Sequence, residues 1–142
     1  GYWYKNGLLF PHLASVAIAL SELTVENGTL RVLKGSHLCG RIDHSVVGGQ
    51  TGADVKRLEV LSKQLDEVVF VSHPGDGIFF HCNTLHSSSP NLSNSTRDIL
   101  LCCFNRADNN PIMQHHHPDY TPLGVLDDGA LLRIGLKTIG AD

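Results

Sequence analysis

The feature of this sequence that most constrains its fold is a series of short apolar runs, each ended by turn-forming residues. The segments EVVFVSH (67–73), GIFFH (77–81) and RDILLCCFN (97–105) have the length of strands, and Pro74-Gly75 marks a turn between the first two. Short strands joined by turns are typical of antiparallel β architectures. The sequence therefore predicts a mainly β sandwich, jelly roll or barrel. The expected strands are few for a barrel that closes on itself.

The first third of the chain adds two expected strands. Residues 13–23 contain the apolar run of a buried strand, with a helix as the alternative because of the length of the run, and residues 29–33 follow as a second strand. Between them lies Asn27-Gly28, a dipeptide that favours the tight turn of a hairpin. We therefore expect these two strands to pair with each other.

The remaining segments predict one well-marked helix, a loop and an irregular tail. Apolar residues recur at helical spacing over 55–65, and Asp54 just before them is a suitable N-cap. The Gly-rich segment 48–54 that precedes this helix is expected to be a flexible surface loop. The tail, residues 108–142, is rich in Pro, Asn and His and is expected to be irregular, with a short helix over about 129–136.

The size and charge of the chain restrict its class of function. Its 142 residues predict a single domain over residues 1–142. A net charge of −3 argues against a nucleic-acid or anionic-membrane surface, and no apolar run approaches the roughly 20 residues that span a bilayer. We therefore expect neither nucleic acid nor a membrane as a partner. Because no targeting signal is visible, we expect an intracellular location, cytoplasmic or organellar. The four cysteines form no C-x-x-C motif and are expected to be buried, reduced residues.

Three residues with the chemistry of a metal and anion site lie close together in the sequence. His86 and Ser88 are two residues apart on an expected strand and share a face, and a hairpin loop is expected to bring Arg97 beside Ser88. A neutral imidazole is a good ligand for Fe(II), and a guanidinium offers a fork of donors that matches a carboxylate. Such a hairpin suits a ligand with an acid at one end and a metal-chelating group at the other, for example an α-keto diacid. The alternative is a polar turn that carries a histidine.

The other histidines have simpler interpretations. His81 is expected to be a partly buried histidine with satisfied hydrogen bonds. The adjacent residues His115–His117 cannot all face one ion and are expected to form a surface cluster, with a structural zinc site that includes His81 or His86 as the alternative. Residues 117–119 spell H-x-D, but they lie in the Pro-rich tail and are discounted as a ligand pair.

The segment GDGIFFHCNTLHSSSPNLSNSTR resembles the C-terminal signature of the phytanoyl-CoA dioxygenase family, whose members are non-haem Fe(II)- and 2-oxoglutarate-dependent oxygenases. The signature contains Gly-Asp, an apolar pair, a histidine with a serine two residues later, and an arginine eleven residues after the histidine. Upstream, ENGTLRVLKGSH is similar to the family's E-N-G, strand and G-S-H segment, with Lys34 where proline is common. The opening YWY resembles the aromatic stretch beside the metal site. Together these matches cover roughly residues 1–110.

This resemblance implies a fold, an activity and site residues. The fold would be a double-stranded β-helix, a cupin-like jelly roll, incomplete at its N-terminus. The activity would be hydroxylation of a small organic or acyl substrate with Fe(II), O₂ and 2-oxoglutarate, the keto acid being converted to succinate and CO₂. His86 matches the distal iron ligand, Arg97 the residue that pairs with the far carboxylate of 2-oxoglutarate, and Ser88 a hydroxyl that assists it. His37 and Asn27 match positions that we interpret as structural.

The sequence departs from the family pattern at the metal ligands. The H-x-D pair that would supply the other two iron ligands is absent before His86. Because Gly1 is followed at once by strand-like aromatics without an initiator methionine, we expect a chain truncated just after that pair and inactive by itself. The alternative is a non-catalytic jelly-roll binding module or a pseudoenzyme of the same family.

Overall fold

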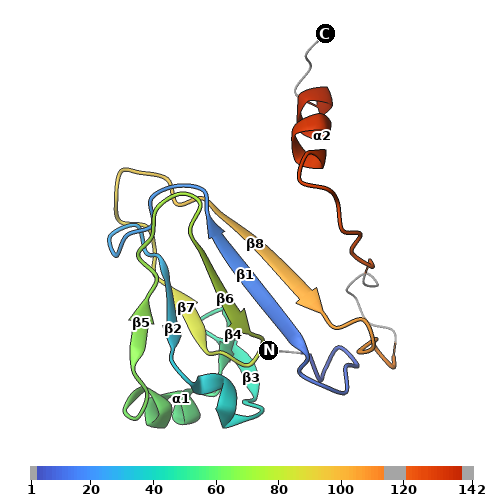
Figure 1. The fold of residues 1–142 in the computed structure, drawn as a ribbon. Coiled ribbons are helices and arrows are strands. Elements are labelled where there is room, and N and C mark those ends of the chain that lie inside the picture. Colours follow the sequence, from blue (N-terminus) through green and yellow to red (C-terminus); the bar gives the residue numbers. More distant parts are fainter. Residues whose placement is uncertain (1–2, 114–120, 139–142) are drawn as a thin grey trace.

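The computed structural model describes residues 3–113 and 121–138, and this part of the chain is mainly β, as predicted (Figure 1). Most strands lie in two three-stranded antiparallel sheets, and two more form a separate hairpin. In chain order the elements are β1 Leu13–Ala19, β2 Leu30–Leu33, the 3₁₀-helix η1 Ser36–Cys39, β3 His44–Val47, β4 Gln50–Ala53, α1 Val55–Ser62, β5 Glu67–Val69, β6 Gly77–His81, β7 His86–Ser88, β8 Ile99–Asn105 and α2 Ala130–Thr138.

The chain crosses repeatedly between the two larger sheets. One has the strand order β6-β1-β8 and the other the order β5-β2-β7. The connection from β1 to β2 therefore leads to the opposite sheet, and so does each connection along the chain from β5 to β8. In the first sheet Ala17 lies opposite Ile78 and Leu101, and in the second Val32 lies opposite Val68 and His86. A chain that alternates in this way winds as a double-stranded β-helix, which is the predicted jelly-roll class.

Two expected hairpins are wrong for the same reason. The strands on either side of Asn27-Gly28 are β1 and β2, which lie in different sheets, and so do β7 and β8 on either side of the loop 89–98. Gly28 does provide a turn, with φ +74°, but this turn leads the chain across from one sheet to the other. A tight-turn signal reports local backbone geometry, whereas the pairing of the flanking strands depends on contacts made far along the chain.

The expected flexible loop at 48–54 is also wrong, because residues 50–53 form strand β4, paired with β3. The turn between these strands contains Gly48 with φ +58° and Gly49 with φ +81°. A two-residue turn of type I′ requires positive φ at both central residues, which glycine adopts without steric cost. The glycines therefore make a defined hairpin turn.

The predicted helix is confirmed as α1 and packs on the second sheet. The Asp54 carboxylate caps it by accepting the Arg57 backbone N–H at 2.8 Å, as the sequence suggested. Leu61 is its buried residue and belongs to a core cluster that also contains Leu33, Ile42 and Leu85. This cluster lies on the face of the β5-β2-β7 sheet opposite His86, since Leu33 and Leu85 alternate with Val32 and His86 along their strands.

The end of the chain contains the second expected helix, and the cysteines differ from expectation. Helix α2 spans Ala130–Thr138, close to the predicted range. All four cysteines are free, but three are half-buried and Cys103 is exposed, so their expected burial is wrong. Within the described ranges, no helix is long and apolar enough to cross a membrane.

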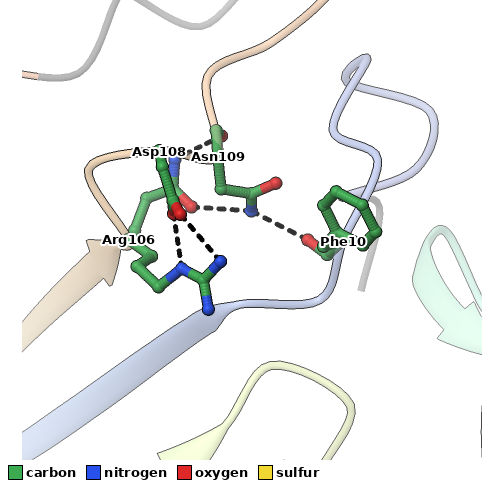
Figure 2. A network of polar contacts seen from close by, with 5 residues as sticks. Phe10, Arg106, Asp108 and Asn109 are labelled. Carbon is green, nitrogen blue, oxygen red and sulfur yellow. Dashed lines mark hydrogen bonds and ion pairs between the residues drawn. The ribbon is translucent and has the colours of Figure 1, made fainter.

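The segment before β1 is held against the turn that follows β8 (Figure 2). Asn109, which is 3% exposed, donates from Nδ2 to the Phe10 carbonyl at 2.8 Å and to Asn105 Oδ1 at 2.9 Å. The Asn105 amide in turn donates to the Asn109 carbonyl at 2.7 Å. An exposed ion pair between Arg106 and Asp108 lies in the same turn. Asn109 thus joins two segments that are almost a hundred residues apart in sequence.

Candidate functional site

His86 faces the space between the two larger sheets. It begins β7, and its ring lies 5.1 Å, between centroids, from the ring of Phe80 on β6 of the opposite sheet. Val32 lies directly across from it on β2. His86 is exposed, so this inner position is accessible to a ligand.

The hydrogen bonding of His86 distinguishes its two ring nitrogens. Its Nδ1 lies 2.9 Å from the Thr84 carbonyl oxygen. A carbonyl only accepts hydrogen bonds, so in the neutral ring Nδ1 carries the proton and Nε2 keeps its lone pair. Metal-binding histidines in proteins are commonly oriented by this arrangement.

A cavity of about 70 Å³ lies beside His86, and Trp3 forms part of its wall. The Trp3 indole N–H donates to Asn83 Oδ1 at 2.8 Å, which brings the start of the chain against the loop that leads into β7. Trp3 of the YWY stretch thus lies near His86. Asn83 was not singled out from the sequence, because its partner is 80 residues away and no local pattern marks the contact.

His44 also lines this cavity. Burial lowers the pKa of its imidazole, an effect only partly opposed by the hydrogen bond between Nδ1 and the Ile42 carbonyl at 2.8 Å. His44 is therefore a predominantly neutral group near pH 7, and it adds no positive charge beside His86.

Ser36 secures the chain just before His86, and the sequence did not indicate this role. Its side chain is fully buried, donates to the Leu33 carbonyl at 2.7 Å and accepts the Leu85 backbone N–H at 2.8 Å. The G-S-H segment thereby links the end of β2 to the residue that precedes His86.

The side chain of Arg97 reaches the end of β7 from the loop between the sheets. Its Nη1 donates to the backbone carbonyls of Ser89, at 2.7 Å, of Asn27, at 3.0 Å, and of Gly28. Ser88 is exposed and lies opposite Leu30 in the strand register. Arg97 is thus brought next to the β7 terminus as expected, although by a crossover and not by a hairpin. The described contacts contain no direct hydrogen bond between Arg97 and Ser88.

His81 is a partly buried histidine with hydrogen-bond partners, as expected. Its Nδ1 accepts the Asn83 backbone N–H at 3.1 Å, and its ring lies 5.9 Å from the ring of His37. Burial is the main cause of a lowered His81 pKa, and the electrostatic interaction with the nearby His37 lowers it further. Neither histidine lines the cavity beside His86.

The residues 3–113 and 121–138 contain no group of three His, Cys, Asp or Glu side chains that could hold a metal ion. His86 fits one position of an iron site, and the described chain does not complete that site. The tract His115–His117 and the H-x-D of residues 117–119 lie outside the described residues.

Comparisons with known proteins agree with this geometry. L-proline trans-4-hydroxylase of Streptomyces griseoviridis is 30% identical over an alignment that covers 89% of this chain and 52% of that protein. Ectoine dioxygenase of Nocardia farcinica is 26% identical, over 85% of this chain and 48% of that protein. The crystal structure of EctD from S. alaskensis with bound Fe aligns with a TM-score of 0.65 and 26% identity, over 78% of this chain and 37% of that chain.

The chain spans about half the length of the curated relatives it matches. The same S. alaskensis protein has also been crystallised with 2-oxoglutarate and 5-hydroxyectoine. The profile of the family described as phytanoyl-CoA dioxygenase (PhyH) matches residues 1–99, well over half of the chain. On this match, the chain belongs to the phytanoyl-CoA dioxygenase family.

Proposed function

We propose that this chain is the C-terminal part of a non-haem Fe(II)- and 2-oxoglutarate-dependent dioxygenase that hydroxylates a small organic molecule. The observation that carries the proposal is the state of His86, whose Nδ1 is committed to the Thr84 carbonyl while Nε2 is left free on the inner face of a β-helix. In the proposal, His86 Nε2 is one ligand of Fe(II). The relatives named above, which include amino-acid and ectoine hydroxylases, support the reaction class.

The second part of the proposal concerns the co-substrate. Arg97 uses Nη1 for backbone carbonyls, so Nε and Nη2 remain as a fork of donors for a carboxylate. We assign this fork to the distal carboxylate of 2-oxoglutarate, with the Ser88 hydroxyl as a further donor. The bound iron would supply the chemistry that couples O₂ to decarboxylation of the keto acid and to C–H hydroxylation.

The other two iron ligands must come from outside the described residues. Trp3 and His86 line the same cavity, which supports an origin of these ligands in polypeptide joined to the start of this chain. We therefore assign the missing histidine and carboxylate to an H-x-D pair just before Gly1, and we expect the 142-residue chain alone to be inactive.

The test begins with the coding sequence immediately upstream of Gly1. If it encodes an in-frame H-x-D, the longer protein is expressed and succinate is measured with Fe(II), O₂, 2-oxoglutarate and candidate small amphiphilic substrates. His86→Ala should abolish succinate formation and iron binding, and Arg97→Lys should raise the KM for 2-oxoglutarate. Asp108→Asn, in an exposed ion pair of the turn after β8, is the matched control and should behave as the wild type. Normal iron binding by His86→Ala would refute the assignment.

A second candidate is a binding module of the same fold without metal. It is favoured by the lack of a three-residue metal cluster in the described part of the chain. It predicts no H-x-D upstream and no stoichiometric Fe(II) in the longest natural form of the protein. Metal analysis of that form after anaerobic loading with Fe(II) separates the two candidates.

A further inference from the structure

We propose that the turn Thr24–Gly28 positions Arg97, so that Asn27 and Gly28 act as positioning residues for the carboxylate that this arginine binds. The assignment of that carboxylate to 2-oxoglutarate rests on the proposed function, but the positioning of Arg97 by the turn does not. The sequence singled out Asn27-Gly28 only as a turn and Arg97 only as an anion-binding residue. The structure connects them.

The connection consists of hydrogen bonds to one nitrogen of the guanidinium. Arg97 Nη1 donates to the carbonyls of both Asn27 and Gly28 and, from the other side, to the carbonyl of Ser89. Three acceptors around a nitrogen with two hydrogens determine both the position and the plane of the guanidinium. Its Nε and Nη2 edge is then the only edge that a ligand can use in bidentate geometry.

The turn that carries these carbonyls is itself closely determined. Asn27, 1% exposed, accepts the Thr24 backbone N–H on Oδ1 at 2.8 Å and donates from Nδ2 to the Glu22 carbonyl at 2.7 Å. The Asn27 backbone N–H donates to Thr24 Oγ1 at 3.1 Å. Each residue therefore donates its backbone N–H to the side chain of the other. The Asn27 side chain therefore has no free polar atom for a ligand, and its role is to hold the turn. The carbonyl is the group it presents to Arg97.

Gly28 is required for a steric reason as well as for its φ of +74°. A Cβ at this position would lie 2.2 Å from the Ser89 carbonyl oxygen, 2.6 Å from that of Pro90 and 2.8 Å from Arg97 Nη1. Two of these three atoms are backbone and cannot move away as a side chain can. Any side chain at residue 28 would therefore push the guanidinium and the end of β7 apart.

The first experiment observes Arg97 directly. In ¹⁵N-labelled full-length protein at low temperature, the hydrogen bonds that Nη1 donates should slow rotation of the guanidinium and resolve its Nη signals. These signals are assigned by their loss in Arg97→Lys. Thr24→Val keeps the side-chain shape but removes the acceptor of the Asn27 N–H, and Gly28→Ala adds the clashing Cβ. Both should merge the Arg97 signals, whereas Thr24→Ser should keep them resolved.

The control is Asp54→Ala, which removes a side-chain oxygen that accepts a backbone N–H at 2.8 Å from the cap of α1, away from Arg97. It should lower the melting temperature without changing the Arg97 signals. If Gly28→Ala does not fold, Thr24→Val decides the matter. Arg97 signals in Thr24→Val identical to those of the wild type would overturn the proposal.

The ligand arm compares 2-oxoglutarate with 2-oxopentanoate, which has the same carbon chain without the distal carboxylate. The wild type should bind 2-oxoglutarate at least about tenfold more tightly, because charge-assisted hydrogen bonds are lost with the other acid. Thr24→Val should bring the ratio of the two dissociation constants towards one, and Asp54→Ala should leave it unchanged. If the wild type does not discriminate between the acids but Thr24→Val still merges the Arg97 signals, the 2-oxoglutarate assignment fails and the positioning role stands. If the wild type discriminates and Thr24→Val keeps both the ratio and the Arg97 signals, the positioning role fails.

Discussion

Replacement of Asn109 by alanine should destabilise the chain more than its position in a loop suggests. The side chain is almost completely buried and its Nδ2 supplies two hydrogen bonds, to the Phe10 carbonyl and to Asn105 Oδ1 (Figure 2). Alanine leaves both acceptors without their donor. It also removes a side-chain hydrogen bond that links the segment before β1 to the turn after β8.

The expected magnitude follows from the number of bonds lost. An intramolecular hydrogen bond contributes a net of about 0.5–1.5 kcal/mol, so the loss of two should lower the free energy of unfolding by about 2 kcal/mol. With a urea dependence of about 2 kcal/mol per molar for a domain of this size, the unfolding midpoint should fall by about 1 M.

The assay is urea unfolding followed by the fluorescence of Trp3, the sole tryptophan of the chain, and by far-UV circular dichroism. Trp3 is a suitable probe because its carbonyl accepts the Leu8 backbone N–H within the segment that Asn109 holds. Asp108→Asn is the control in the same turn, since its ion pair with Arg106 is exposed and solvent-screened, and it should leave the midpoint unchanged. A midpoint for Asn109→Ala within about 0.2 M of the wild type would refute the reasoning.

Three further predictions concern other parts of the molecule. Leu61→Ala should lower the free energy of unfolding by about 2–5 kcal/mol, because it opens a cavity in the core beneath α1; a loss below 1 kcal/mol in urea titrations would contradict that packing. Burial lowers the pKa of His81, so the unfolded chain binds this proton more readily; stability should fall as pH drops below about 6.5, and melting temperatures of His81→Asn should show a weaker decline. Cys103 is exposed, whereas Cys82 is half-buried with its thiol pKa raised by burial; peptide mapping should therefore find iodoacetamide on Cys103 first, and equal rates would argue against this difference.

Local features of the fold were predictable because they depend on neighbouring residues. Asp54 caps α1 since a carboxylate just before an amphipathic run accepts a free helix N–H, and this contact spans only three residues. Strands such as β6 and β8 follow from short apolar runs bounded by turns. The glycine pair Gly48-Gly49 was misjudged as flexible, because its composition suits both a mobile loop and a type I′ turn, and only the pairing of β3 with β4 decides between them.

The structure brings the predicted site residues near one another, but by a different route from the one expected. His86, Ser88 and Arg97 were placed together on one hairpin, whereas Arg97 approaches β7 from a crossover between sheets. Sequence proximity happened to agree with spatial proximity because the crossover loop is short. The contact of Trp3 with Asn83 had no such local signal, since the two residues lie at distant positions in the chain.

The sequence by itself therefore determined the mainly β class, the capped helix, the turn glycines and the residues with metal and anion chemistry, because each depends on side-chain type and spacing over a few residues. Only the tertiary structure decided which strands pair and that the Asn27 and Gly28 carbonyls hold Arg97. The physical reason is that these features depend on contacts between segments far apart in the sequence, such as Asn27 and Arg97, which are 70 residues apart. Local secondary-structure propensity and hydrophobic periodicity carry no information on such long-range contacts.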